Sequence, residues 1–319
     1  MNCKKRDVEC IIVGYAGVDR IIRITGNAEK GKTSLVLNRD NRNVTCGGNG
    51  SNVSICMAKL GCHVLPVMRV GADWETLGYR QVLEESGVCL DGVTVVENET
   101  TSICHLIEDE SGNHLTLTYP GAMDEKYVPD AWDESLFQRA RYGLVTVATR
   151  QDIERFLELS EKHRLPLVFG VRVDLESFPL PVFERLLFSA EVIFMNEVER
   201  EFVEREIASL QDIGQRGQAK HIVVTKGSLG SDVYIVTPSG MERIHANAAA
   251  CRGVVDATGA GDSYIAGYMY SYLKGCGAEE CAVTASCEAS FIIEKVGCTA
   301  GAPTEAQLLE KVKTYYQGG

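Results

Sequence analysis

The sequence predicts an α/β fold in which helices cover both faces of a mostly parallel central sheet and a small β-sheet lid lies at one side. From about residue 49 onward, short apolar runs alternate with longer helix-like segments, which is typical of parallel strands joined by crossover helices. Four strand-like segments within about 15–46 and 98–120 have no helices between them, and they predict the lid. No composition shift or long linker divides the chain, so we expect a single domain over 1–319.

The N-terminal part begins with the apolar run Glu9–Val13, which predicts a buried strand that ends in a glycine-containing turn. The lid is expected to contain two short strands and a hairpin that turns at 109–113; these segments are Thr33–Leu37, Asn43–Cys46 and Ser102–Tyr119. Between them, the pattern predicts a helix, a strand and a second helix, at Ser51–Leu60, Val64–Met68 and Glu75–Glu85.

The alternation of strands and helices resumes after the lid. We expect strands at Gly143–Ala148, Pro166–Phe169 and Val192–Met195, each followed by a helix, at Asp152–His163, Pro181–Phe188 and Glu197–Glu204. Three consecutive strands are then expected at one edge of the sheet, at His221–Thr225, Ser231–Val236 and Met241–His245. The last expected elements are helices at Ala260–Leu273, Ala278–Glu294 and Thr304–Tyr316.

The net charge of -12, from 44 acidic and 32 basic side chains, opposes binding to nucleic acid or to an anionic membrane. The apolar stretch Ile11–Val13 is too short for a signal sequence or a transmembrane helix. We therefore expect a cytoplasmic protein whose substrates are small molecules.

The 12 cysteines contain no Cys-x-x-Cys pair and no Cys/His cluster with the spacing of a zinc site. Most of them stand in apolar runs. We interpret them as reduced, packed thiols.

The segment Val254–Asp262 joins an apolar run to an apolar helix through small residues. Unpaired amides at a helix N-terminus can bind a phosphate group, and Gly259 and Gly261 allow close approach of the backbone to such an anion. Asp262 would stand in the first turn of the helix, where a carboxylate can accept the proton of an attacking hydroxyl. The alternative is that Asp262 only stabilises the helix N-terminus, and the local pattern leaves both readings open.

The pattern D-x-T-G-A-G-D in this segment resembles the C-terminal signature of the ribokinase-like (phosphofructokinase-B type) carbohydrate kinase family. The resemblance implies a ribokinase-like three-layer α/β/α domain with a small β-sheet lid. It implies that Asp262 is the catalytic base and that Gly259, Ala260 and Gly261 form the anion hole. It also implies that Asp256 and Thr258 contribute oxygen atoms to a monovalent-cation site, although a need for potassium remains open.

Further signatures of this family follow in order along the chain. The segment 14–19 is similar to the early G-x-x-x-x-D motif, whose aspartate, here Asp19, binds hydroxyl groups of the acceptor. The segment 47–52 resembles G-G-x-x-x-N, which implies that Gly47, Gly48 and Asn52 contact the acceptor. Alternatively, the glycines cap the lid strand and Ser51 or Asn49 caps the next helix, and capping does not exclude contact with a ligand.

Two later motifs resemble the part of the family pattern that binds the phosphate donor. Asn196 and Glu199 match N-x-x-E, in which the glutamate orders the water bound to Mg²⁺, and Thr225, Gly227 and Gly230 match T-x-G-x-x-G along the phosphates of ATP. A solvated helix start and an ordinary turn are the structural alternatives. Ser286 stands in the expected region for the ATP base, where many relatives have asparagine, so the preference for ATP over GTP stays open.

The segment Tyr119–Met123 reads Y-P-G-A-M and is similar to adenosine-kinase-like nucleoside kinases. Tyr119, and also Tyr15, could stack on a nucleobase or could simply pack under the lid. The strand near 166–172 departs from the family because it lacks the usual Asp-Pro pair. Arg172 follows this strand and is a group suited to an anion or to the edge of a base.

The resulting hypothesis is an ATP-dependent kinase that uses Mg²⁺ and phosphorylates the 5'-type hydroxyl of a nucleoside such as adenosine, inosine, guanosine or cytidine. The alternatives are a kinase of ribose, fructose or a related sugar acid and, from another class, a non-catalytic nucleotide or sugar sensor. A Rossmann dehydrogenase is disfavoured because no strand is followed by a clean G-x-G-x-x-G. Exposed lid edges also suggest a homodimer that pairs through the lid.

Overall fold

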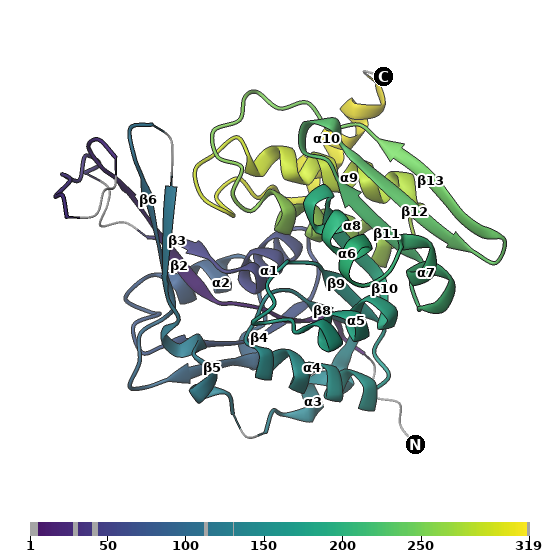
Figure 1. The fold of residues 1–319 in the computed structure, drawn as a ribbon, viewed down its shortest axis with the longest axis horizontal. Coiled ribbons are helices and arrows are strands. Elements are labelled where there is room, and N and C mark those ends of the chain that lie inside the picture. The colour runs from purple at the N-terminus through teal and green to yellow at the C-terminus, as the bar shows by residue number, and fades with distance from the viewer. Residues whose placement is uncertain (1–5, 28–30, 40–43, 112–113, 130, 318–319) are drawn as a thin grey trace.

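The computed structural model describes residues 6–27, 31–39, 44–111, 114–129 and 131–317. A large sheet runs through the molecule with helices on both faces, and a smaller sheet projects beside it (Figure 1). This arrangement confirms the predicted α/β fold with a separate small sheet. Within the described ranges, no helix has the length and apolar character that crossing a bilayer requires.

In the described part of the chain, the large sheet has nine strands in the order β13-β12-β11-β10-β9-β8-β1-β4-β5. Strands from β11 to β5 are parallel, whereas β12 pairs antiparallel with β11 and β13. Their bounds are β1 (Val8–Val13), β4 (Val64–Gly71), β5 (Val93–Val96), β8 (Ala140–Val145), β9 (Leu167–Gly170), β10 (Ala190–Asn196), β11 (His221–Thr225), β12 (Ser231–Thr237) and β13 (Gly240–Ala246). Because the chain proceeds from β1 to β4 on one side and later to β8 on the other, a crevice is expected at the carboxyl ends of these strands.

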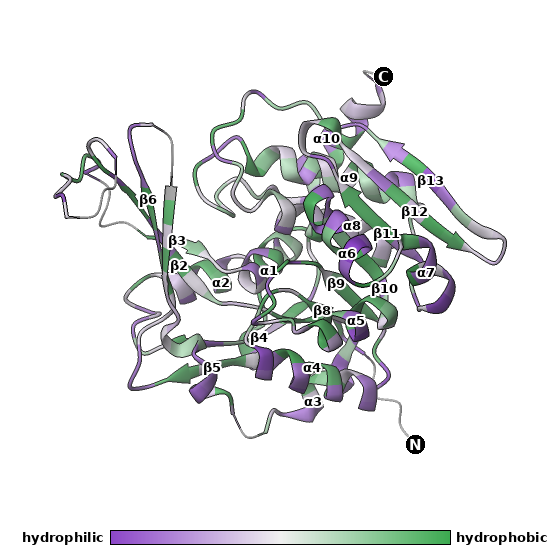
Figure 2. Cartoon of the chain, viewed as in Figure 1, coloured by the Kyte–Doolittle hydropathy of each residue, from purple (hydrophilic) through white to green (hydrophobic). Residues whose placement is uncertain are grey.

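The helices form two layers around two hydrophobic cores. Alternate residues of β1 serve the two cores: Cys10 and Ile12 belong to one, and Ile11 and Val13 belong to the other. Figure 2 shows apolar strands in the interior and polar outer surfaces on helices such as α4. The helices are α1 (Asn49–Lys59), α2 (Tyr79–Glu85), α3 (Glu134–Arg139), α4 (Arg150–Lys162), α5 (Leu180–Ser189), α6 (Glu197–Glu206), α7 (Leu210–Arg216), α8 (Ala260–Leu273), α9 (Ala278–Ile292) and α10 (Glu305–Gln317).

The smaller sheet, here called the lid sheet, consists of β2 (Gly17–Arg23), β3 (Thr45–Gly47), β6 (Ile103–Glu108) and β7 (His114–Tyr119), in the order β3-β2-β6-β7. Strands β2 and β6 are parallel, and the other pairs are antiparallel. Asp19 is paired with Cys104, which is paired with Thr118. Since paired residues point to the same side of a sheet, these three side chains share one face of the lid sheet.

The structure differs from the sequence prediction in several elements. Strand β2 was not predicted, because polar side chains on both of its faces hide the period-two pattern. The predicted strand at 33–37 is wrong in the described residues, where only Val36 forms an isolated bridge, with Ile24. Helix α2 begins at Tyr79 and not at Glu75, because Gly78 adopts a left-handed conformation with φ 72° before it. The short elements β5, α3 and α7 were also missed.

The other predicted helices and strands are present with ends shifted by a few residues. Part of the predicted lid turns, at 40–43 and 112–113, lies outside the described residues. The cysteines of the described part are all free thiols, and each is buried or partly buried, as the sequence predicted.

Candidate active site

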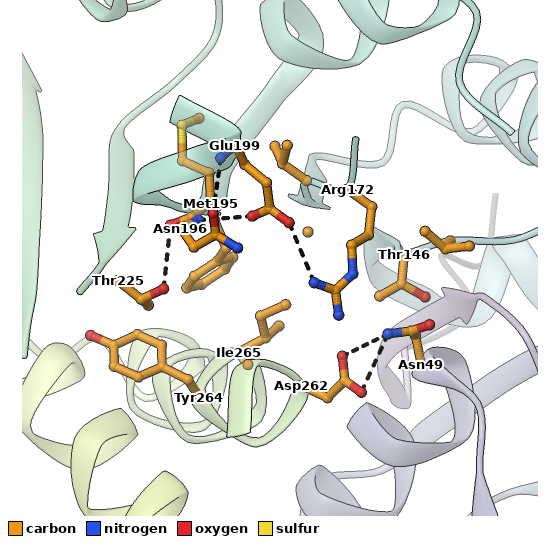
Figure 3. A pocket seen from close by; sticks show the side chains of 15 residues that line it. Asn49, Thr146, Arg172, Met195, Asn196, Glu199, Thr225, Asp262, Tyr264 and Ile265 are labelled. Carbon is orange, nitrogen blue, oxygen red and sulfur yellow. Dashed lines mark hydrogen bonds and ion pairs between the residues drawn. The ribbon is translucent and has the colours of Figure 1, made fainter. Parts of the chain in front are cut away.

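A cavity at the carboxyl edge of the large sheet brings together residues from distant parts of the chain (Figure 3). Thr146 follows β8, Arg172 follows β9, Asn196 ends β10 and Thr225 ends β11. The N-terminal turns of two helices complete the lining, with Asn49 of α1 and Gly261 and Asp262 of α8. Carboxyl ends of parallel strands are the usual place for a ligand site in such sheets.

Asp262 lies in the first turn of α8, as the sequence predicted, and is buried with 8% of its surface exposed. Its two carboxylate oxygens accept hydrogen bonds from two amides of α1. Nδ2 of Asn52 donates to Oδ2 at 2.8 Å, and Nδ2 of Asn49 donates to Oδ1 at 3.1 Å. Asn49 and Asn52 are three positions apart on one helix, so they present their side chains on the same face.

Two opposing effects act on the acidity of Asp262. Burial raises its pKa above the ordinary aspartate value of 3.8, while the amides of Asn52 and Asn49 lower it. The net shift is upward. A buried carboxylate whose pKa lies above the ordinary value is a better proton acceptor than a solvated one, provided that the pH is high enough to ionise it.

Sequence reasoning identified Asn52 but missed Asn49. The signal that could have found it is the i, i+3 spacing of two amides at the start of one apolar helix. The buried Oδ1 of Asn52 has no hydrogen-bond partner, although buried polar atoms are nearly always paired. Asn52 itself is not among the residues that line the cavity, so its observed part in the site is to hold the carboxylate of Asp262.

The predicted anion-hole segment begins α8. Gly259 precedes the helix with φ 80°, and a Cβ added to it would lie 2.7–2.9 Å from backbone and side-chain atoms of Cys298, so only glycine fits without strain. The first amides of a helix have no acceptor within the helix. The amide of Ala260 donates to the carbonyl of Ala257 at 3.2 Å.

The predicted cation-site residue Asp256 is held by backbone amides. Its Oδ1 accepts from the amide of Thr258 at 2.9 Å, and its Oδ2 accepts from the amide of Gly297 at 2.9 Å. Burial opposes ionisation, but these hydrogen bonds give a net lowering of the pKa of Asp256. The carboxylate therefore stays charged and ties the loop before α8 to the segment after α9.

Asn196 and Glu199 form a reciprocal cap at the start of α6. The side chain of Asn196 accepts from the amide of Glu199 at 2.8 Å, and Oε2 of Glu199 accepts from the amide of Asn196 at 2.8 Å. Both residues therefore stand at a helix start, as the structural alternative held, but Glu199 is buried and not solvated, and both line the cavity. Oε1 of Glu199 contacts the guanidinium of Arg172 at 3.4 Å, and burial raises the pKa of Glu199.

Two glycines, Gly47 and Gly48, allow the backbone to pack closely around Asp19 of the lid sheet. A Cβ on Gly47 would lie 2.4 Å from Oδ2 of Asp19, and a Cβ on Gly48, whose φ is 88°, would lie 2.4 Å from the carbonyl oxygen of Tyr15. Both glycines thus bring α1 and β3 close to the lid strand. Burial raises the pKa of Asp19, and the nearby thiol of Cys298 lowers it.

Tyr119 does not share the face of the lid sheet that carries Asp19. Because Thr118 shares that face, the next residue along β7 points to the opposite side. The hydroxyl of Tyr119 donates to Glu99 at 2.9 Å, and its side chain is 48% exposed. The interpretation of Tyr119 as an acceptor contact is therefore wrong for this arrangement, because the strand register decides the direction of its side chain.

A second cavity of about 500 Å³ adjoins the first and shares Thr225, Gly261 and Tyr264 with it. Gly227, Gly230 and Ser286 line this cavity, as expected for a donor-nucleotide site. The hydroxyl of Ser286 is already engaged, because it accepts from the amide of Ala249 at 2.7 Å and donates to the carbonyl of Asn247 at 3.4 Å. Ser286 therefore shapes the loop that borders the cavity.

The described residues contain no group of three or more His, Cys, Asp and Glu side chains that could hold a metal ion. A Mg²⁺ ion that accompanies a nucleotide is usually bound by phosphates and water, with one or two carboxylates nearby. Glu199 fits such a role, because Oε1 is directed into the cavity while Oε2 is fixed by the cap.

The sequence of the chain is similar to those of several known kinases. A nucleoside kinase of Methanothermobacter thermautotrophicus is 28% identical over 96% of both chains. The nucleoside kinase of Methanocaldococcus jannaschii is 27% identical over 99% of both chains; its crystal structure has a TM-score of 0.84, with 97% of this chain and 99% of that chain covered. A ribokinase of Arabidopsis thaliana is 25% identical, covering 95% of this chain and 80% of its own length.

The model of one protein family, the pfkB family carbohydrate kinases, matches residues 9–305, which include both cavities and the lid sheet. The chain therefore belongs to the pfkB family of carbohydrate kinases.

Proposed function

We propose that the protein is an ATP-dependent nucleoside kinase that phosphorylates the 5'-hydroxyl of a nucleoside such as adenosine, inosine, guanosine or cytidine. The observation that carries the proposal is the buried Asp262 carboxylate at the start of α8, held by Asn49 and Asn52 beside the two adjoining cavities. The two nucleoside kinases that match this chain nearly end to end support the nucleoside as acceptor. One catalytic domain over 1–319, with lid strands from about 15–46 and 98–120, would carry the whole reaction.

In the proposed reaction, the acceptor hydroxyl lies in the cavity beside Asp262, whose carboxylate Asn49 and Asn52 orient. Asp262 accepts the hydroxyl proton while the oxygen forms a bond to the γ-phosphorus of ATP. The bond from that phosphorus to the bridging oxygen breaks, and its electron pair leaves with ADP. Amides of Gly259 and Gly261 at the helix start would stabilise the negative charge of the transferred group, and that of Ala260 would join them by exchanging the carbonyl of Ala257 for a phosphoryl oxygen.

The acceptor would be bound by Asp19 and Asn52, with Gly47 and Gly48 shaping its site. Asn196, Thr225, Gly227, Gly230 and Ser286 would surround the ATP. Mg²⁺ supplies charge neutralisation on the phosphates, and Glu199 would orient its water molecules. Asp256 and Thr258 would hold a monovalent cation such as K⁺, for which the carboxylate and hydroxyl oxygens are suitable ligands.

We also propose a homodimer that pairs through the lid sheet. Leu115, Leu117 and Tyr119 alternate along β7 and are each about half exposed, at 48%, 50% and 48%. They lie on the face opposite to Asp19. Burying such a face against a second subunit would remove apolar surface from water. Size-exclusion chromatography with light scattering would test it, and a monomer at micromolar concentration would rule it out.

The test of the proposed function is phosphorylation by the purified protein across a panel of nucleosides and free sugars, with Asp262→Asn in parallel. We expect turnover on a nucleoside and a loss of about 10²–10⁴-fold in kcat for the variant. The kcat/KM of the wild type should fall at low pH, with a midpoint above 3.8 because the pKa of Asp262 is raised. Turnover on free sugars alone would replace the nucleoside with a sugar; nucleotide binding without any turnover would favour a sensor.

A further inference from the structure

The charges in the active-site cavity are unbalanced for a reaction that handles phosphate. Among the described residues that line it, the two acidic ones are Glu199 and Asp262, and the one basic residue is Arg172. The whole chain carries a net charge of -12. A transferring phosphoryl group, which is strongly anionic, must pass between these two carboxylates. The guanidinium of Arg172 points into the space between them (Figure 3).

The backbone that carries Arg172 is firmly placed. Gly170 ends β9, and a Cβ there would lie 2.9 Å from Cδ1 of Ile265 in α8. The amide of Val171 donates to the carbonyl of Phe194 in β10 at 2.8 Å. The start of α8 thus lies close to the end of β9, and of the residues that follow β9 and line the cavity, Val171 and Arg172, only Arg172 carries a charge.

The guanidinium itself is loosely held. The side chain of Arg172 is 53% exposed, and its contact with Glu199 is a single one at 3.4 Å. A structural arginine in the same protein is very different: Arg69 makes two contacts with Asp152, at 2.5 and 2.9 Å, and is 3% exposed. Exposed ion pairs contribute little to stability. Arg172 therefore keeps its side chain free to exchange partners at small cost.

We propose that Arg172 is a catalytic residue that leaves Glu199 when ATP binds and donates two N–H groups to the equatorial oxygens of the γ-phosphoryl group during transfer. This role rests on the proposed kinase function. The planar guanidinium matches the spacing of two phosphoryl oxygens, which an ammonium does not. No proton moves to or from Arg172. The proton of the acceptor goes to Asp262, and the electron pair of the broken bond goes to ADP.

The main competing role is that Arg172 only neutralises Glu199. The two roles predict different behaviour when Glu199 loses its charge. If Arg172 acts only by neutralising Glu199, then Glu199→Gln should remove most of the defect of Arg172→Ala. If Arg172 contacts the phosphoryl group, Arg172→Ala should lower kcat by a similar factor in the Glu199→Gln background and in the wild type.

The experiment measures steady-state kinetics of the wild type, Arg172→Ala, Arg172→Lys, Glu199→Gln and the double variant Arg172→Ala with Glu199→Gln. Arg150→Ala is the matched control, because Arg150 is also 53% exposed and has one carboxylate partner, Glu154 at 2.9 Å, in α4. We expect Arg172→Ala to lower kcat about 10²–10³-fold with a small change in KM for either substrate. Arg172→Lys should recover part of the rate, Arg150→Ala should be unchanged, and thermal stability should be equal for all single arginine variants.

Two readouts separate a direct contact from an indirect one. Guanidinium chloride, at concentrations well below those that unfold proteins, should restore part of the kcat of Arg172→Ala and leave Arg150→Ala unchanged. The variant should also bind ADP with aluminium fluoride, which mimics the planar phosphoryl group, about tenfold or more weakly than the wild type, while binding ADP alone equally well.

A full kcat in Arg172→Ala, recovery in the double variant, or equal affinity of both proteins for ADP with aluminium fluoride would each overturn the proposal. The kinase function is judged separately, by wild-type turnover and its loss in Asp262→Asn. A kinase with active Arg172→Ala would thus contradict only the role of Arg172. A wild type without turnover on any acceptor would contradict the function on which that role rests.

Discussion

The thiol of Cys298 lies 3.5 Å from Oδ2 of Asp19, although 279 positions separate the two residues in the sequence. The same stretch of backbone packs against Gly259, and the neighbouring amide of Gly297 donates to Asp256. One short segment after α9 therefore contacts the carboxylate of Asp19, the start of α8 and the loop that precedes α8. Sequence reasoning missed Cys298, because its significance arises only from these contacts.

We predict that Cys298→Ala raises the KM for the acceptor about two- to tenfold, which corresponds to the loss of one hydrogen bond, and leaves the KM for ATP unchanged. Burial raises the pKa of the Cys298 thiol well above its ordinary value, so the thiol stays protonated and remains a donor at neutral pH. Cys298→Ser, which keeps a donor, should retain a near-normal KM. Cys276→Ala serves as the control. Equal KM values in the alanine and serine variants would show that the donor is unimportant.

Gly259→Ala should reduce both stability and activity. At φ 80° an alanine is strained, and its Cβ would also overlap atoms of Cys298 at 2.7–2.9 Å. Gly275 provides a matched control, since its φ is 81° and nothing lies within 4 Å of an added Cβ. We expect Gly275→Ala to cost about 1–2 kcal/mol of unfolding free energy from the backbone conformation alone, with normal kcat. Gly259→Ala should cost more and lower kcat; equal effects in urea unfolding would contradict the steric argument.

Glu288 in α9 should make the stability of the protein depend on pH. It is fully buried, and neither carboxylate oxygen has a hydrogen-bond partner. Burial therefore raises its pKa well above the ordinary value of 4.5. The folded state keeps a proton that the unfolded state releases, so the free energy of unfolding should fall as the pH rises from about 4.5 toward the raised pKa, with a limiting slope of about 1.4 kcal/mol per pH unit.

The variant Glu288→Gln isolates this effect, because a neutral amide of the same shape cannot ionise. Urea unfolding of both proteins between mildly acidic and mildly alkaline pH measures the difference. The advantage of the variant should grow with rising pH. A constant difference across this range would mean that Glu288 does not bind the additional proton.

The second cavity, in which we propose that ATP binds, predicts weak discrimination between nucleotide bases. None of the described residues that line it is acidic, basic or histidine, and the hydroxyl of Ser286 is engaged by Ala249 and Asn247. A site that does not bind the base edge through dedicated side chains cannot reject an analogue strongly. We expect kcat/KM for ATP and GTP to agree within about tenfold. Ser286→Ala should raise the KM values for ATP and GTP together, because it removes the hydrogen bonds that hold the bordering loop. A large preference for ATP would show that backbone groups recognise the base.

The sequence by itself determined the fold class and most of the elements, because these depend on local periodicity. Apolar runs such as those at β1 and β10 are buried on both faces, and the lengths of the intervening segments match helices. The sequence also predicted that Asp262 stands in the first turn of a helix, because small residues at 257–261 separate an apolar run from an apolar helix. Local periodicity did not predict the polar strand β2, because it carries charged side chains and shows no clear alternation.

Only the tertiary structure decided which side chains meet. The register of the lid sheet turned Tyr119 away from Asp19, and a slip of one residue would have reversed that outcome. The packing of α1 against α8 brought Asn49 to Asp262 across 213 positions. The packing of β9 beside β10 and α8 brought Arg172 into one cavity with Glu199 and Asp262. Contacts of this kind depend on how distant elements pack, and the local pattern of residues does not encode the distances between them.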